Sequence, residues 1–445
     1  MALTKKTSTA ERPVLCTRNF DFFMFLHDVC RLGMFGLVVL LWGLHASWTP
    51  SNASGFALYT SGAAELALND SVVAHTEGPA SNFYNPALLP KLEGTQVESG
   101  TIPLQASVEY TSDFTGRTSR MKRNVFYPST LFISHQFNDG FSAGLGVNST
   151  FGLGTEWPDD WEGRYIATES YLETYNINPN MAWKVSDRLI LAAGFNILFG
   201  DVTYEQKIDP LLLPAGSDGH SKMKGDGEGY GYNLGLLYTF SQDLSFGMSY
   251  RSGIDLKLKG RMEWSQPGVG VLVDTHAKVD LHLPAQLFAG VSFRPFENII
   301  LEIGGKWEGW SSYKNLKIRA DQPIFSGNSI STIPKNWKDV YGFNVGVKYF
   351  INPTLSIAAG YLHEGNPVPS DTFEPSVPVS DRVDFSFGIQ KHFGPFRVAV
   401  TYLYDKYESR RKDNSVIGFS ATGITANGKY EQDIHMAGLS VSYRF

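Results

Sequence analysis

Alternation of apolar and polar residues is the feature that most limits how this chain can fold. Beyond Glu93 the sequence repeats in steps of two, for example in residues 355–361 (LSIAAGY), 383–390 (VDFSFGIQ) and 437–445 (AGLSVSYRF). Because successive side chains of a β-strand point to opposite faces, a period of two predicts strands with one apolar and one polar face. Soluble β-sandwiches alternate in the same way, so the pattern alone predicts an all-β chain without choosing between a sandwich and a barrel.

The lengths of the connections between these segments favour a barrel. Short turns are predicted at Asn138-Asp139-Gly140, Ser186-Asp187, Ser241-Gln242-Asp243, Phe296-Glu297-Asn298, Ile351-Asn352-Pro353 and Phe393-Gly394-Pro395. Longer polar or Gly/Pro-rich connections are predicted at 111–123, 155–168, 208–228, 263–273, 318–335, 366–379 and 411–427. Short turns at one end and long loops at the other are typical of outer-membrane barrels. We therefore predict that residues 93–445 form a transmembrane antiparallel β-barrel of about 14 strands.

The composition agrees with this prediction and excludes other classes. The chain has 445 residues, 18% of them charged, and one long apolar run, which argues against a disordered chain and against a membrane protein of many helices. The net charge of −6 leaves no basic footprint for nucleic acid. The mean hydropathy of −0.16 does not indicate solubility, because lipid-facing and lumen-facing residues average out in a barrel.

The N-terminus is predicted to be a secretory signal, residues 1–53. Its apolar run, residues 32–44, is too short to span a bilayer as a helix but suits a signal peptide, with cleavage expected before Ser54. A membrane anchor or a buried helix is the alternative, and translation could begin at Met24. Both cysteines, Cys16 and Cys30, lie in this segment, so the exported chain would have no disulfide, thiolate metal site or cysteine nucleophile.

Residues 54–92 do not alternate and are rich in small residues. They precede the first predicted strand, so they could form either a periplasmic arm or a plug. A lumen of fourteen strands is too wide for side chains alone to fill. An inserted plug, or hatch, at 54–92 is therefore our prediction.

Several motifs together resemble the FadL-type outer-membrane transporters of long-chain fatty acids and hydrophobic hydrocarbons. The most specific is Asn85-Pro86-Ala87, which is similar to the NPA motif that ends the family's hatch, and Gly55-Phe56 resembles the family's mature N-terminus. Further matching stretches are 151–153, 172–174, 281–284, 310–311 and 366–369. The resemblance implies a fourteen-stranded barrel with a hatch. It also implies passive uptake by capture in an extracellular groove, transfer to a hatch-side pocket, and lateral exit at a kink in the third strand.

Candidate ligand contacts lie in two loops and the hatch. The run Leu211-Leu212-Leu213 on an exported loop suggests an apolar groove, with self-packing of the loop as the alternative, and Trp264 and Val271 would form the opposite wall. By resemblance, Phe56 and Leu58 are the N-terminal ligand contacts, with plug packing as the alternative.

A fatty acid carboxylate would need a cation. The resemblance assigns this role to Lys317 near the outer ligand site. The family's partnering arginine falls at Gln206 here, with Lys207 beside it, and this departure leaves room for an uncharged hydrocarbon.

Gating residues are predicted in the hatch and the third strand. Asn85, Pro86 and Ala87 would seat the hatch against the strand kink, and Gly144 and Gly146 would permit a bend or a close approach of the hatch.

Other functions are weighed against this one. The histidines are scattered and no H-E-x-x-H motif occurs, so we expect no enzyme, cofactor or metal. The expected partners are a hydrophobic small molecule, outer-membrane lipid and, through Phe445 at the end of an alternating strand, the barrel assembly machinery. We expect no nucleic acid and a monomer. An aromatic-hydrocarbon channel of the same family and a general porin are the alternatives.

Overall fold

The computed structural model describes residues 55–323 and 328–445. The predicted signal peptide, its cleavage site and both cysteines lie outside the described residues. Among the described residues no helix is long and apolar enough to cross a membrane.

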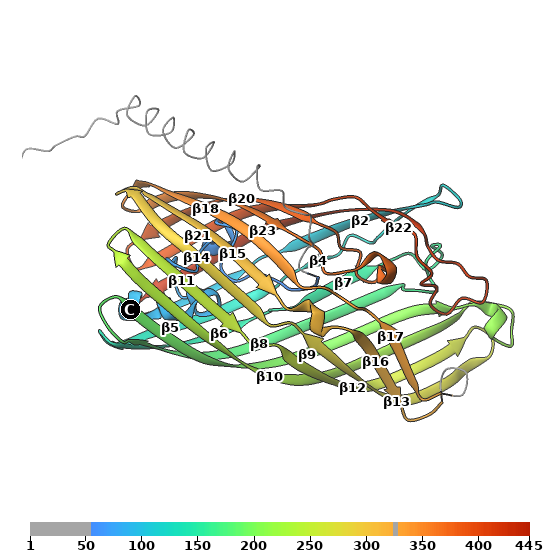
Figure 1. Ribbon diagram of the computed structural model, residues 1–445. Coiled ribbons are helices and arrows are strands. Elements are labelled where there is room, and N and C mark those ends of the chain that lie inside the picture. The colour runs from blue at the N-terminus through green and yellow to red at the C-terminus, as the bar shows by residue number, and fades with distance from the viewer. Residues whose placement is uncertain (1–54, 324–327) are drawn as a thin grey trace, which may run out of the picture. The chain divides into compact units, whose positions relative to one another are not determined.

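The strands form one closed antiparallel sheet of fourteen barrel strands, as the sequence predicts (Figure 1). Short breaks within the wall divide several barrel strands into segments, so the labelled strands outnumber the barrel strands. The first half comprises β1 (Thr95–Thr101) with β2 (Leu104–Ser112), β3 (Thr118–Arg120) and β4 (Val125–Phe126) with β5 (Ser129–Asn138), β6 (Phe141–Asn148) with β7 (Gly152–Glu156), β8 (Glu169–Lys184), β9 (Leu189–Ile208), β10 (Gly219–Ser241) and β11 (Leu244–Arg251) with β12 (Ile254–Gln266). The second half comprises β13 (Gly270–Leu283) with β14 (Gln286–Phe296), β15 (Ile299–Glu308) with β16 (Asn315–Ala320), β17 (Ile330–Pro334) with β18 (Val340–Asn352), β19 (Leu355–Glu364), β20 (Arg382–Phe393), β21 (Phe396–Tyr407) with β22 (Arg410–Lys412), and β23 (Gly428–Arg444).

The barrel closes between its first and last strands. β1 pairs with β23 from Gln96↔Arg444 to Thr101↔Leu439, and the Phe445 N–H donates to the Thr95 carbonyl at 2.9 Å. Closure removes both free edges of the sheet, which is how a β-structure satisfies its backbone groups in lipid.

All six predicted short turns join neighbouring strands at one end of the barrel, but several of the long connections are shorter than predicted. β16 runs to Ala320 and β17 occupies Ile330–Pro334, so the predicted connection 318–335 is 321–329. β10 begins at Gly219, so the predicted loop 208–228 is 209–218, and β12 and β13 reduce 263–273 to a tight hairpin. The reason is that Lys224, Asp226 and Glu228 point outward from β10 between glycines. Such a strand has no apolar outer face, so its sequence lacks the alternation that predicts a strand and resembles that of a polar loop.

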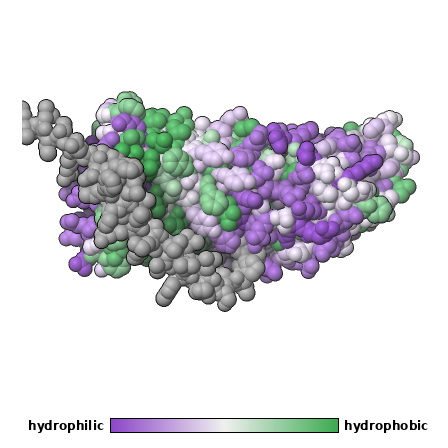
Figure 2. Space-filling model, turned by 90° about the horizontal axis from the view of Figure 1, so that it is seen from above, coloured by the Kyte–Doolittle hydropathy of each residue, from purple (hydrophilic) through white to green (hydrophobic). Residues whose placement is uncertain are grey.

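The alternation reverses its sense along the barrel. Near the short turns the outward residues are apolar, such as Leu234, Phe387 and Val441, and inward ones such as Asn233 are polar. Further from the turns β12 buries Leu256 and Leu258 inside and exposes Lys257 and Lys259 outside. Figure 2 shows the result on one face, with hydrophobic residues gathered toward the short-turn end and hydrophilic residues beyond them. The apolar belt fits the bilayer, and the polar part projects past it.

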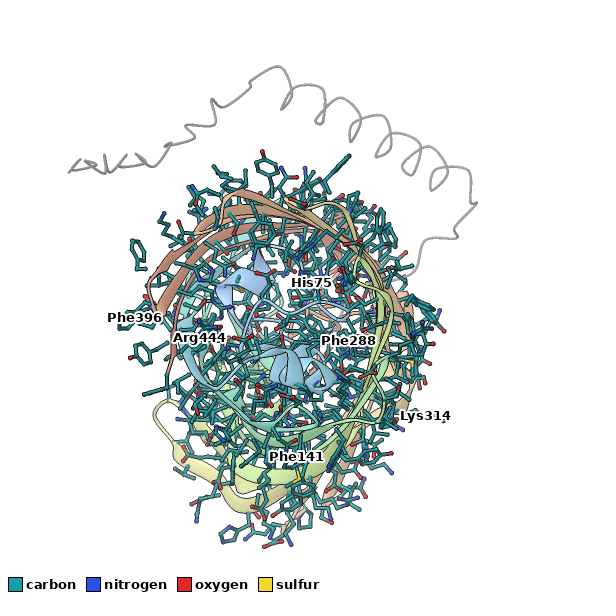
Figure 3. The ribbon with its side chains drawn as sticks, turned by 90° about the vertical axis from the view of Figure 1, so that its left-hand side faces the viewer. His75, Phe141, Phe288, Lys314, Phe396 and Arg444 are labelled. Atoms are coloured by element: carbon teal, nitrogen blue, oxygen red, sulfur yellow. The ribbon has the colours of Figure 1, made fainter. Side chains whose placement is uncertain are left out.

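Residues 55–92, the N-terminal segment, lie inside the ring of strands (Figure 3). The segment contains two single-turn helices and a 3-10 helix: α2 (Ala63–Leu66), α3 (Ser81–Tyr84) and η1 (Pro86–Lys91). Glycines of the wall let its backbone approach closely. A Cβ on Gly247 would lie 2.0 Å from the Val73 carbonyl oxygen, so only glycine fits there.

Candidate functional site

The start of the N-terminal segment adds a short strand to the barrel wall. The third barrel strand is interrupted between β6 and β7, and Ala57 forms a bridge with Phe151 at this break. The Leu58 N–H donates to the Thr150 carbonyl and the Gly152 N–H donates to the Phe56 carbonyl, both at 2.9 Å. The backbone of the segment therefore pairs with the third barrel strand at this break.

One side of β7 lacks a neighbouring strand in the described part of the chain. β6 pairs with both β5 and β8, whereas β7 pairs with β8 alone. Past the bonds that Thr150 and Gly152 form with the N-terminal segment, the unpaired stretch is Leu153–Thr155, and it ends where the Lys122 N–H donates to the Glu156 carbonyl at 2.8 Å. The Phe126 ring packs across it, because a Cβ on Gly154 would lie 2.1 Å from this ring.

A cavity of about 470 Å³ lies behind this unpaired stretch, between the N-terminal segment and the wall. Its volume is within the usual range for sites that bind small molecules. Its apolar lining comes from both sides and includes Phe56, Leu58, Val125, Phe126, Phe151, Leu153, Leu172, Leu403, Ile434 and Met436.

In the part of the chain that the structure describes, the polar lining offers no free cation. Arg382 is the only lysine or arginine there that lines the cavity, and Asp70, Glu173 and Asp384 also line it. The Arg382 guanidinium donates to Glu364 at 2.7 and 3.0 Å and to Asp405 at 2.8 Å. Its charge is therefore already neutralised by buried carboxylates.

Two of the predicted ligand contacts, Phe56 and Leu58, line this cavity. The Phe56 ring is 6% exposed and lies 4.7 Å from Trp310, 5.5 Å from Trp337 and 6.4 Å from Phe151 between ring centroids. It is packed in an aromatic cluster and at the same time faces the cavity, so both roles expected for it are compatible.

The predicted loop contacts lie elsewhere, in the part of the barrel beyond the apolar belt. Leu211, Leu212 and Val271 are 72%, 55% and 59% exposed, Leu213 is half-buried beside Gly219, and none of them lines the cavity. The half-buried Trp264 packs its ring 5.3 Å from that of Phe419. Gln266 beside it joins the two predicted walls, since its side chain accepts from the Ala215 N–H at 3.3 Å and donates to the Ser217 carbonyl at 2.9 Å.

Neither predicted lysine reaches the cavity. The Lys207 ammonium forms an ion pair with Asp159 at 2.7 Å. Lys317 is exposed on the outer face of β16, because its neighbour Ile318 takes the buried inner position. This parity follows from the reversed alternation above the apolar belt.

Asp209 fastens this loop region. Its carboxylate accepts from the N–H groups of Leu211, Ala421 and Thr422 at 2.9 to 3.2 Å. Burial opposes the charge, but these hydrogen bonds and that of the Thr422 hydroxyl outweigh it and lower the pKa of the Asp209 carboxyl.

The NPA motif is placed differently from its prediction. The Asn85 amide donates to the Val73 carbonyl at 2.7 Å and to the Leu236 carbonyl of β10 at 3.0 Å, and its oxygen accepts from the Ala87 N–H at 3.1 Å. Asn85 and Pro86 thus lie against β10 and not against the kink, where they were expected. Pro86 and Ala87 begin η1, which Asn85 caps.

Asn82, three residues before the motif, is the residue that meets the third strand. A Cβ on Gly144 would lie 2.3 Å from the Asn82 side-chain oxygen, and one on Gly146 would lie 2.7 Å from its nitrogen. These two glycines therefore serve the close approach that was one of their two predicted roles.

A second anchor of the N-terminal segment was not predicted. The buried Glu302 carboxylate of β15 accepts from the N–H groups of Val73, Ala74 and His75 at 2.6 to 3.1 Å, and it contacts the His75 ring at 2.6 Å. His75 lies inside the barrel in Figure 3. An inward glutamate in an alternating strand gave no sequence signal beyond its parity.

Known proteins resemble this chain in sequence and in fold. The family described as "Outer membrane protein transport protein (OMPP1/FadL/TodX)" matches residues 43–445. The chain is 23% identical over 385 residues to a long-chain fatty acid transport protein of Escherichia coli O6:H1, covering 78% of this chain and 85% of that protein. It is 24% identical to a 47 kDa outer membrane protein of Pasteurella multocida, covering 88% and 92%.

Solved structures agree with the fold. A Pseudomonas aeruginosa FadL homologue superposes with a TM-score of 0.79 at 19% identity, covering 88% of this chain and 100% of that one. The Ralstonia pickettii toluene transporter TbuX superposes with a TM-score of 0.69 at 17% identity, covering 86% and 98%. With residues 43–445 matched, this protein belongs to the OMPP1/FadL/TodX family of outer-membrane transport proteins and is not an enzyme.

Proposed function

We propose that the protein admits hydrophobic, uncharged small molecules passively across the outer membrane. The observation that carries the proposal is the apolar cavity between the N-terminal segment and the unpaired edge of β7. A greasy molecule gains about 25 cal/mol for each Å² of apolar surface that leaves water, so an apolar cavity selects it where a water-filled pore would not.

The proposed route has three steps. The exposed leucines 211–212 and Val271 capture the molecule in an extracellular groove. It then passes to the cavity beside Phe56 and leaves sideways between the second and third barrel strands, past Phe126. Residues 54–92 act as a hatch on the 93–445 barrel, and a shift of the hatch's first residues opens the path.

Charge favours an uncharged ligand over a fatty acid. Arg382, the one arginine that lines the cavity among the described residues, is neutralised by Glu364 and Asp405, and Lys207 and Lys317 point elsewhere. A carboxylate placed there would lose its hydration without gaining a partner. Fatty acids are the second candidate, because relatives with this fold include a long-chain fatty acid transport protein as well as a toluene transporter.

Uptake of labelled toluene and of labelled oleate should be compared in cells with the gene deleted and in cells where it is restored. We expect toluene uptake to fall in the deletion strain and oleate uptake to change little. Unchanged uptake of both compounds would refute transport, and loss of oleate uptake alone would refute the preference for an uncharged ligand.

The oligomeric state and the assembly of the barrel form a further part of the proposal. We propose that the barrel works as a monomer and that its last residue is read by the assembly machinery. Phe445, 76% exposed at the end of β23, is accessible to such a partner.

A further inference from the structure

One part of the cavity lining is acidic. Asp70 of the N-terminal segment and Asp384 of β20 both line the cavity, and they are only 4% and 3% exposed. The cations next to them, Lys306 and Arg382, are shared among five buried carboxyl groups, namely Asp70, Glu308, Glu364, Asp384 and Asp405. This part of the cavity therefore carries more acids than bases.

Both cations are bound to carboxylates that do not line the cavity. The Arg382 guanidinium donates to Glu364 at 2.7 and 3.0 Å and to Asp405 at 2.8 Å. The Lys306 ammonium lies 2.9 Å from a Glu364 oxygen and 3.8 Å from the centre of the Tyr59 ring. Neither cation is left for Asp384, because its Oδ2 lies 3.9 Å from Nη2 of Arg382, beyond hydrogen-bond distance.

The strand register gives Asp384 no further donor. Asp384 lies directly opposite Asp405 on β21 and opposite Leu362 on β19. A proton shared between the two opposed carboxyl groups would satisfy only one oxygen of Asp384. Within residues 55–323 and 328–445, no N–H group or hydroxyl donates to the Asp384 carboxyl group.

Asp70 is in a similar position. Its Oδ1 accepts from the Tyr84 hydroxyl at 3.0 Å, and among the described residues no group donates to its Oδ2. The remaining carboxyl group of the lining, that of Glu173, differs because it accepts from the hydroxyls of Tyr171 and Tyr175. Asp70 and Asp384 are therefore the two lining carboxyl groups that have oxygens left for a ligand.

Three kinds of hydrophobic ligand would behave differently beside these oxygens. A hydrocarbon gains from the apolar lining but leaves the oxygens without a donor, which is costly in a buried site. A carboxylate brings another negative charge next to the acids, and like charges repel each other strongly where water is excluded. A hydroxyl group donates to one of the carboxylates, and a hydrogen bond to a charged acceptor is stronger than one between neutral groups.

We propose that the cavity prefers hydrophobic molecules that carry a hydroxyl group, such as phenols and alcohols. The hydroxyl donates to Asp384 or Asp70, and the rest of the molecule lies against the apolar lining. This inference rests on the proposed function, in which the cavity is the ligand site. It narrows the ligand class from uncharged hydrophobic molecules to those that donate a hydrogen bond.

The test compares three ligands that share one skeleton: toluene, 4-methylphenol and 4-methylbenzoate. Their binding to the purified full barrel in lipid nanodiscs is measured by equilibrium dialysis of the labelled compounds, with empty nanodiscs as the blank. The double variant Asp70→Asn/Asp384→Asn removes both charged acceptors. Asparagine tolerates the left-handed backbone of Asp70, where φ is 64°. The matched control is Asp139→Asn/Asp243→Asn, in two exposed turns at the short-turn end. Heat-modifiability on a gel checks that each variant is folded.

We expect the cavity variant to bind 4-methylphenol about 5-fold more weakly, since one hydroxyl donates one hydrogen bond and a neutral acceptor replaces a charged one. Toluene should bind equally to the wild type and the variant, and 4-methylbenzoate should bind more tightly to the variant because the repulsion is reduced. The control variant should bind all three ligands as the wild type does.

Unchanged affinity of the folded cavity variant for 4-methylphenol would overturn the inference, and so would an equal loss of affinity for 4-methylphenol and toluene. In both cases toluene binding to the wild type would leave the proposed function standing. A wild-type barrel that binds neither compound would overturn the inference together with the role of the cavity in the proposed function.

Discussion

Replacing Phe56 by alanine should detach the first residues of the N-terminal segment without unfolding the barrel. The ring is almost fully buried among four aromatic rings, Trp310, Tyr313, Trp337 and Phe151. Deleting a buried phenylalanine side chain costs about 3–5 kcal/mol. The strand ladder of the barrel does not include this residue, so the cost should appear as local opening of the segment. Even about 3 kcal/mol makes the opened state about 150-fold more populated.

Hydrogen exchange of two amides reports this opening directly. The Leu58 and Gly152 N–H groups bond across the junction of segment and wall, and both should exchange at least about 100-fold faster in Phe56→Ala. Amides of the β9–β10 ladder should be unchanged. Phe114→Ala is the matched control, because Phe114 is 92% exposed in a loop. If Leu58 and Gly152 exchange at wild-type rates in folded Phe56→Ala, the aromatic cluster does not hold the segment and the reasoning is wrong.

Three further predictions test other parts of the site. Asn85→Ala removes two buried hydrogen bonds, one within the N-terminal segment and one to β10, so it should weaken the attachment of the segment to β10 by about 1–3 kcal/mol. The variant should therefore leak small polar solutes faster than the wild type in a liposome-swelling assay. A leak equal to that of the wild type would contradict this. Gly154→Val should place a branched side chain in the space beside β7 that the Phe126 ring now fills, and so narrow the unpaired stretch and slow uptake. Gly140→Val, where a Cβ has room, should not slow it; equal uptake by both variants would contradict the lateral route. The lowered pKa of Asp209 means that the unfolded loop binds a proton more readily than the folded loop. The stability that the Asp209 hydrogen bonds give the loop is therefore fully present above about pH 4 and is lost as the pH falls through the lower, folded pKa. Asp209→Ala should abolish that pH dependence in the exchange of the Ala421 and Thr422 amides, and a persisting dependence would refute the role.

The barrel could be predicted from sequence because its two determinants are local. Alternation sets which face each residue takes, and the lengths of connections set which end each turn occupies, so fourteen strands followed from the printed sequence. The failures at 208–228 and 263–273 arose where strands leave the membrane. There the outer face of the strands is exposed to water, so an outward lysine such as Lys224 or Lys257 gives the same sequence pattern in a strand as in a loop.

The site could be predicted only in part, because its key contacts are between segments far apart in the sequence. Phe56 and Leu58 were found through the family resemblance, and their cavity was not visible in the chain. Asn82 and Glu302 were missed because an asparagine or glutamate on an inward position has many uses, and only the fold shows that both meet the N-terminal segment. Lys317 was assigned by resemblance without strand parity, which directs it outward.

The two kinds of anchor explain which part of the segment can move. The Glu302 carboxylate accepts three backbone N–H bonds, so displacing residues 73–75 would leave a buried charge without donors, at a cost of several kcal/mol. The first residues are held instead by one bridge and by ring packing around Phe56. A hydrophobic ligand that enters this cluster replaces ring contacts with its own, so it offsets the cost of moving Phe56 but can do nothing for the polar anchor. We therefore infer that a ligand shifts only the start of the segment, at the point where β7 is unpaired, while the rest of the lumen stays closed to water.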